Sequence, residues 1–97
     1  MRYEVVLAPE AVQDLRKLDA RVRATVRDAI EKHLRHQPTR TTRSRIRRLR
    51  GLARPQYRLR VGEVRVFYDV VEVRVEVLAI VRKPDAKAWL ERAGERG

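Results

Sequence analysis

Hydrophobic residues in the first forty positions follow two different periods. The alternation over residues 3–7 predicts a short strand. Two helical stripes follow, one from Pro9 to about Leu18 and one from Asp19, a suitable N-cap, to Pro38. Their apolar positions at helical spacing are Ala11, Val12, Leu15, Leu18, Val22, Val26, Ala29, Ile30, His33 and Leu34. With almost no linker between them, the two helices are predicted to form an antiparallel hairpin.

The second half of the chain has mainly the pattern of strands. Polar residues 39–44 predict a loop, and residues 45–50 a strand or an irregular approach to the sheet. Three further strands are expected at about residues 56–61, 64–71 and 74–82. The last of these is apolar on both faces, so we expect it to be central. Pro84 opens a short C-terminal helix, which is expected to fray at its Gly-containing end.

These elements define a fold class. The order strand, two helices, three or four strands, helix predicts an α+β fold. We expect a mostly antiparallel four- to five-stranded sheet packed against an N-terminal helical hairpin, with a short C-terminal helix. At 97 residues the chain is expected to form one domain, residues 1–97.

A β-hairpin in the third quarter of the chain brings arginines together. Residues 57–61 and 64–68 both alternate, and Gly62-Glu63 suits a two-residue turn with glycine at a positive φ. The facing pairs are then Tyr57 with Tyr68, Leu59 with Val66, Arg60 with Arg65, and Val61 with Val64. The arginines on one face are Arg58, Arg60 and Arg65. Because like charges placed opposite each other are destabilising, this face predicts a polyanionic ligand, and Asp69 on the same face is expected to balance Arg65.

Composition narrows the class of protein. With 43% hydrophobic and 38% charged residues, the chain is too apolar for disorder, and it has no apolar run of transmembrane length. It has no cysteine, which removes disulfides and thiolate chemistry, and no N-terminal segment typical of export. We therefore expect a cytoplasmic protein that does not engage a membrane.

The positive charge is concentrated. The net charge is +11, and residues 40–65 hold ten arginines and one acid, Glu63. Arginine suits bidentate phosphate contacts, although GC-rich coding sequence also favours Arg, Ala and Val, so the clustering is the stronger signal. For the stretch Arg43 to Arg54, charge alone leaves three interpretations open: it binds nucleic acid, an acidic protein partner covers it, or it is a solvated face without a partner. The first two are compatible.

Three pieces of the sequence carry a resemblance to a known superfamily. They are Ala8-Pro9-Glu10-Ala11 with Asp14-Leu15 and Leu18, then Leu49-Arg50-Gly51, and the run Tyr57-Arg58-Leu59-Arg60-Val61-Gly62-Glu63-Val64-Arg65-Val66-Phe67-Tyr68. In order, spacing and total length the chain resembles the RelE/ParE toxins of type II toxin-antitoxin pairs. RelE-like members are ribosome-dependent mRNA endonucleases, whereas ParE-like members inhibit DNA gyrase and cleave nothing. The resemblance implies a toxin, and we expect the RelE-like activity, an mRNA interferase that inhibits translation.

The resemblance also implies site residues. In RelE-like nucleases a ribose 2′-OH attacks its neighbouring phosphate, and basic residues stabilise the charge that develops. The matching basic positions here are Arg58, Arg60, Arg65 and Lys83, which we expect to be catalytic. The family's tyrosine corresponds to Trp89, whose indole cannot act as a general base and is expected to stack on an RNA base. The further RNA-binding residues expected are Arg45, Arg47, Arg48 and Arg50.

The resemblance implies partners as well. We expect an acidic cognate antitoxin, the ribosome with its mRNA, and operator DNA only through the antitoxin complex. No cofactor or metal is expected, since the reaction needs none and His33 and His36, three residues apart, have no third ligand nearby. Two alternatives remain: a ParE-like gyrase inhibitor without enzymatic activity, and a catalytically lapsed homologue that acts as a co-repressor with its antitoxin.

Overall fold

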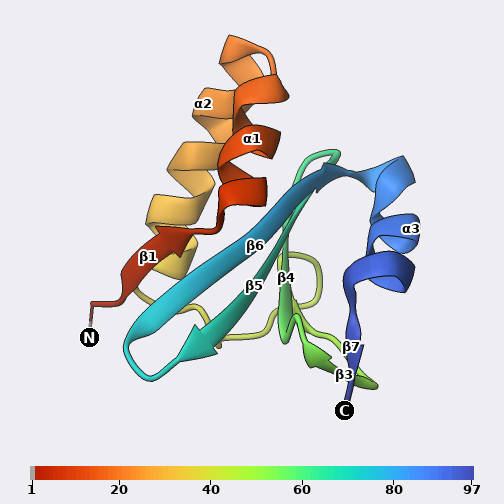
Figure 1. Ribbon diagram of the computed structural model, residues 1–97. Helices are drawn as coiled ribbons and strands as arrows, with labels where there is room; N and C mark the ends of the chain where they lie inside the picture. The colour runs from red at the N-terminus through yellow and green to blue at the C-terminus, as the bar shows by residue number, and fades with distance from the viewer. Residues whose placement is uncertain (1) are drawn as a thin grey trace.

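A five-stranded sheet in the order β1-β6-β5-β4-β2 forms the centre of the computed structural model, which describes residues 2–97 (Figure 1). Its strands are β1 (Glu4–Leu7), β2 (Ile46–Arg48), β4 (Tyr57–Val61), β5 (Val64–Val71) and β6 (Arg74–Arg82). β1 pairs with β6 in parallel, and every other neighbouring pair is antiparallel. The α+β fold with a mostly antiparallel sheet is confirmed, and the strand that is apolar on both faces, β6, has a neighbour on each side.

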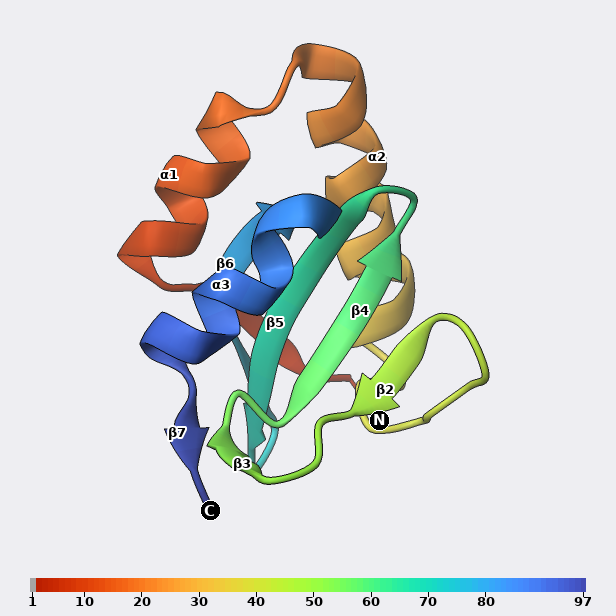
Figure 2. The same cartoon turned by 90° about the vertical axis from the view of Figure 1, so that its right-hand side faces the viewer.

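Two helices cover one face of the sheet and a third helix covers part of the other (Figures 1 and 2). α1 (Pro9–Lys17) and α2 (Ala20–Ala29) form the predicted hairpin, and α2 continues into η1 (Ile30–Leu34), a π-helical turn. The N-cap prediction is confirmed, because the Asp19 side chain accepts a hydrogen bond of 3.0 Å from the N–H of Val22. α3 (Lys83–Ala93) lies on the opposite face. Within residues 2–97 no helix is long and apolar enough to cross a lipid bilayer.

The end of the chain does not fray as expected. Beyond α3, β7 (Glu95–Arg96) pairs with β3 (Leu52–Arg54) in a second, two-stranded sheet. Gly94 ends α3 in an extended conformation while its N–H donates to the Leu90 carbonyl at 2.8 Å, and a Cβ at this position would collide with that carbonyl. The glycine therefore redirects the chain into a strand instead of loosening it.

The hydrophobic core lies between the helical hairpin and the sheet. Its fully buried members include Val26, Leu34, Leu59, Val66, Val75 and Val77. A smaller cluster lies under α3 on the other face and is built from Phe67, Ala79 and Trp89. Each of the two faces of the sheet thus buries apolar side chains, and the larger cluster lies on the face under the hairpin.

The β4–β5 hairpin has the predicted register. Tyr57 faces Tyr68 and Arg60 faces Arg65, and Gly62 in the turn has a φ of +57°. The rings of Tyr57 and Tyr68 stack with centroids 5.5 Å apart, and the buried Tyr68 hydroxyl donates a hydrogen bond of 2.6 Å to the Pro38 carbonyl. Burial raises the pKa of Tyr68 far above its usual value. This contact ties the chain after the helical hairpin to the centre of the sheet.

Tyr68→Phe should destabilise the fold, because it leaves the Pro38 carbonyl buried without its donor. We expect a loss of about 1–3 kcal/mol in the free energy of unfolding, measured by urea denaturation. Tyr57→Phe, which keeps the stacked pair at a less buried position, should cost much less. Equal losses for the two variants would contradict the role assigned to the Tyr68 hydroxyl.

Candidate functional site

Four arginines face one another on the side of the sheet that α3 partly covers. Arg47 on β2 faces Arg58 on β4, and Arg60 on β4 faces Arg65 on β5. We call Arg47, Arg58, Arg60 and Arg65 the arginine cluster. In Figure 2, α3 lies in front of β5 and β6, whereas β4 and β2 are open on this side. The structure therefore brings three of the expected catalytic arginines together and adds Arg47, which was expected to bind RNA.

Arg58 is the electrostatic centre of the cluster. Burial, followed by repulsion from Arg65, Arg47 and Arg60, lowers the pKa of its guanidinium below the usual value. Its Nε is buried and has no hydrogen-bond partner among residues 2–97. A buried donor without an acceptor, surrounded by like charges, is an arrangement that an anion would stabilise.

Arg65 is less accessible than the sequence suggested. The residue is 7% exposed, and Nη1 donates to the carbonyls of Gly62 at 2.7 Å and Val64 at 3.1 Å. The guanidinium thus braces the β4–β5 turn as well as contributing charge to the cluster. Arg47 and Arg60 are exposed, so these two members are best placed to contact a ligand directly.

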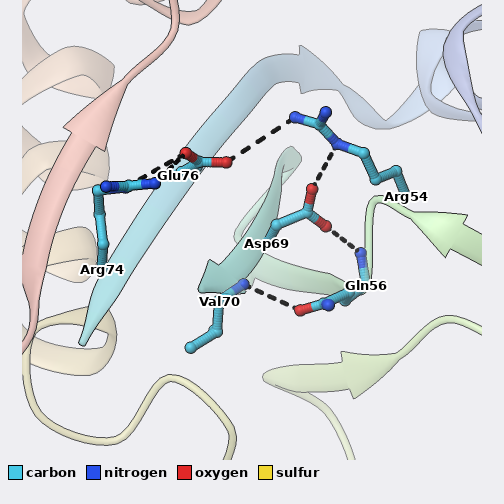
Figure 3. A network of polar contacts seen from close by, with 6 residues as sticks. All are labelled: Arg54, Gln56, Asp69, Val70, Arg74 and Glu76. Atoms are coloured by element: carbon cyan, nitrogen blue, oxygen red, sulfur yellow. Dashed lines mark hydrogen bonds and ion pairs between the residues drawn. The ribbon is translucent and has the colours of Figure 1, made fainter. Parts of the chain in front are cut away.

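The expectation that Asp69 balances Arg65 is wrong. Asp69 is buried further along β5, where it accepts hydrogen bonds of 2.7 Å from Nε of Arg54 and from the N–H of Gln56 (Figure 3). The Gln56 side chain in turn accepts from the N–H of Val70 at 2.9 Å. Within the described chain, no carboxylate makes an ion pair with the arginine cluster.

Trp89 is a packing residue. It is 5% exposed, stacks on Phe67 with ring centroids 5.0 Å apart, and donates a hydrogen bond of 2.6 Å from Nε1 to Glu10 on α1. The expectation that Trp89 stacks on an RNA base disagrees with this placement, because the ring is already buried between protein groups. Alternation along β5 places the apolar Phe67 on the same face as Arg65. This pattern is the sequence signal for an apolar packing partner of Trp89 on that face.

Lys83 lies at the start of α3, beside the hairpin turn. Its N–H donates to the Glu63 carbonyl at 2.7 Å, which fixes the helix start against the turn that Arg65 braces. The side chain lines a groove of about 650 Å³ between α3 and the loop after β2, together with Arg50, Lys87 and Arg96. Sequence reasoning missed Lys87 and Arg96. The spacing of Lys83 and Lys87, four apart on a helix, is a signal that predicts their shared face.

The other expected RNA-binding residues lie along the edge strand. Arg47, Arg48 and Arg50 line a second cavity of about 400 Å³, and Arg50 is shared with the α3 groove. The Arg48 guanidinium lies 5.3 Å from the centre of the Tyr57 ring and donates to the Gln56 carbonyl at 2.9 Å. Arg45 is separated from this group, since its side chain lines a cavity with His33.

A metal centre finds no support in the described part of the chain. Residues 2–97 contain no cluster of three His, Cys, Asp or Glu side chains that could hold a metal ion. The site is instead a set of fixed positive charges and hydrogen-bond donors. Such a set can bind phosphate groups and can stabilise negative charge that develops on them.

Solved structures with the same fold are components of toxin-antitoxin systems. The toxin-antitoxin complex RelBE2 from Mycobacterium tuberculosis matches with a TM-score of 0.68 and 25% identity, over 84% of this chain and 99% of that chain. The RelB-RelE antitoxin-toxin complex from Methanococcus jannaschii matches with a TM-score of 0.65 and 18% identity, over 87% and 96%. A free mutant of the E. coli toxin RelE matches with a TM-score of 0.58 and 18% identity, over 96% and 99%. No curated protein matched in sequence.

Together with the match to a family model, this fold identifies the chain as a toxin of the RelE/ParE type. Residues 5–86 match the family described as the ParE toxin of type II toxin-antitoxin system, parDE, and the chain belongs to this family.

The arginine cluster should respond to small anions. Millimolar pyrophosphate is expected to raise the melting temperature of the protein, because it neutralises charges that repel one another. Arg60→Gln should stabilise the anion-free protein by up to about 1 kcal/mol, since it removes one of two facing charges, and should reduce the pyrophosphate effect. Arg43→Gln, at an exposed loop position outside the cluster, is the matched control for differential scanning fluorimetry. An equal pyrophosphate effect in both variants would show that the anion binds elsewhere.

Proposed function

We propose that this toxin acts on RNA at the ribosome and cleaves messenger RNA. The observation that carries the proposal is the arginine cluster, four facing guanidiniums with an unpartnered Nε on Arg58 and no carboxylate paired to them within residues 2–97. RNA supplies the phosphates that such a cluster binds, and its 2′-OH is a nucleophile that DNA lacks.

The proposed reaction is an internal displacement. The ribose 2′-oxygen bonds to the adjacent phosphorus, the bond from phosphorus to the 5′-oxygen breaks, and a 2′,3′-cyclic phosphate forms. Arg58 and Arg60 stabilise the extra negative charge on the phosphorane, and Lys83 in the α3 groove contacts the same strand. Trp89 takes no proton, so the 2′-OH proton passes to water, and the leaving 5′-oxygen receives a proton from water.

A ParE-like function without catalysis is the second candidate. It is favoured by the match to the ParE family and by the burial of Trp89 at the position where RelE-like nucleases carry a tyrosine. In that case the basic groove would bind a surface of DNA gyrase. The two candidates differ in the process that stops first in a cell.

An acidic antitoxin is the partner we propose. The neighbours from Mycobacterium tuberculosis and Methanococcus jannaschii are toxin-antitoxin complexes. A chain of net charge +11, whose arginine cluster pairs with no carboxylate within residues 2–97, gains from association with an acidic segment, which would cover the cluster and exclude RNA.

Induction of the toxin in growing cells should stop protein synthesis before DNA synthesis. Incorporation of labelled amino acids is expected to fall within minutes, while incorporation of labelled thymidine continues. Co-induction of the antitoxin gene is the control. Early loss of thymidine incorporation, accompanied by gyrase-dependent DNA breaks, would favour the ParE-like candidate.

Arg60→Ala should lower the rate of mRNA cleavage by about a hundredfold, because it removes a charged contact worth on the order of 3 kcal/mol in the transition state. The exposed position of Arg60 keeps the fold intact, which its melting temperature will check. Arg43→Ala, with the same change of charge outside the cluster, should cleave within about twofold of the original protein. Primer extension on mRNA from treated ribosomes gives both rates, and equal losses would exclude a specific role for the cluster.

A further inference from the structure

A third basic cavity lies on the helical side of the edge strand β2, away from the arginine cluster. Its volume is about 240 Å³. Its lining residues are Lys32, His33, Gln37, Arg40, Thr42, Arg45 and Ile46. Three of them are cationic, one is histidine, and none of the described residues that line it is acidic. We call this cavity the π-turn pocket.

The pocket is built on the one irregular turn of the helical hairpin as described over residues 2–97. α2 ends in η1 (Ile30–Leu34), which supplies Lys32 and His33 to the pocket. π-helical turns are rare and are often found at functional sites, since they reposition side chains that an α-helix would aim elsewhere. The turn and the loop of residues 40–45 thus converge on one space.

The hydrogen bonds around the pocket leave donors available for an anion. Thr42 Oγ1 accepts from the N–H groups of Arg45 at 2.9 Å and Ile46 at 3.3 Å, so its own hydroxyl proton remains to be donated. Arg40 is held by the Gln37 side-chain oxygen at 3.1 Å through only one of its N–H groups. An oxyanion in this space would meet hydroxyl, guanidinium and ammonium donors together.

His33 gives the pocket a dependence on pH. Burial, followed by the charges of Arg45 and Lys32, lowers the pKa of His33 below its usual value. The cationic groups that line the space with it are Lys32, Arg40 and Arg45. The imidazole is therefore neutral at pH 7 in the empty pocket, whereas a bound anion favours the protonated form. By linkage, anion binding tightens as the pH falls through the pKa of His33 in the complex.

The pocket continues into the basic surface already described. It shares Thr42 and Ile46 with the cavity at Arg47, Arg48 and Arg50, and that cavity shares Arg50 with the α3 groove. A row of cationic cavities thus runs from the π turn around β2 to α3. Ile46 is the only apolar residue among the described residues that line the first two cavities, whereas the α3 groove is also lined by Leu52, Leu90 and Glu91. Cationic sites with few apolar side chains, as in the first two cavities, suit a phosphodiester chain better than a protein segment, which needs apolar anchors.

We propose that the π-turn pocket binds a backbone phosphate of single-stranded RNA that passes around β2, outside the arginine cluster. The proposal rests on the proposed RNA target, but it concerns binding at a separate place. It adds Lys32, His33 and Arg40 to the residues that engage RNA and makes the engagement stronger in mildly acidic conditions.

The first test uses inorganic phosphate and the histidine signals of the full chain in NMR spectra. Phosphate is expected to raise the pKa of His33 by about one unit and to leave the exposed His36, which lies outside the pocket, unchanged. Arg45→Gln should abolish the shift, whereas Arg43→Gln should keep it. Equal shifts of His33 and His36, or no shift, would overturn the proposal.

The second test uses a 2′-O-methyl oligoribonucleotide, which binds but cannot be cleaved. Arg45→Gln and, independently, Lys32→Gln are expected to weaken binding several-fold and to reduce the salt dependence by about one counterion each. His33→Gln should remove the tightening between pH 8 and pH 6. If these variants bind like Arg43→Gln, or if oligoglutamate shifts His33 while the oligonucleotide does not, the RNA assignment is overturned.

Neither test needs a ribosome or a cleavage step. If the unmodified protein does not cleave mRNA but the π-turn pocket binds phosphate and the oligonucleotide as expected, only the nuclease function is contradicted. Normal cleavage with no effect of Arg45→Gln on binding would contradict the pocket alone.

Discussion

The fixed register of β4 and β5 is the constraint on which both faces of the molecule depend. With Leu59 opposite Val66 and Arg60 opposite Arg65, the apolar side chains of β4 and their partners on β5 point under α1 and α2, whereas the guanidiniums and Phe67 point to the other face. A shift by one residue would exchange the two sets and bury the arginines in the core. Burial of the apolar face therefore keeps the arginines of the other face close together despite their mutual repulsion. Gly62, with its positive φ, forms the turn between β4 and β5.

The second face is divided between packing and charge. Phe67 and Trp89 attach α3 to the sheet, and the hydrogen bond from Trp89 to Glu10 links that helix to α1. The part of the face that α3 leaves open is the part that carries the arginine cluster. The same helix supplies Lys83 and Lys87 to the groove, so the packing of Trp89 on Phe67 also helps to place these two lysines.

The sequence pattern predicted the features that depend on neighbouring residues, such as strand register and helix capping. The features that depend on contacts between distant segments were not predicted. Alternation and one glycine were sufficient for the β4–β5 register, and the capping residue Asp19 was sufficient for the start of α2. Asp69 was expected to balance Arg65, which is close in sequence, but its carboxylate accepts hydrogen bonds from Arg54 and Gln56. These two partners are brought to Asp69 by the segment before β4, and the hydrophobic pattern of the sequence does not predict the course of that segment. Trp89 was placed at the surface because its partner on α1 lies 79 positions away. The π turn at Ile30–Leu34 replaces a helical continuation that the apolar stripe predicted, and such irregular turns have no simple sequence signal.

The guanidinium of Arg58 is partly desolvated, its Nε has no partner among residues 2–97, and its Nη2 donates only a long hydrogen bond of 3.4 Å to the Ser44 carbonyl, so the protein without an anion is electrostatically strained. A polyanion that binds this face relieves the repulsion between the arginines, and this adds to the free energy of its own contacts. An RNA target and an acidic inhibitor would therefore both draw on the same favourable term. An acidic inhibitor on this surface would therefore do two things at once. The inhibitor would block the binding of RNA, and it would protect the toxin from unfolding and proteolysis until the inhibitor itself is removed.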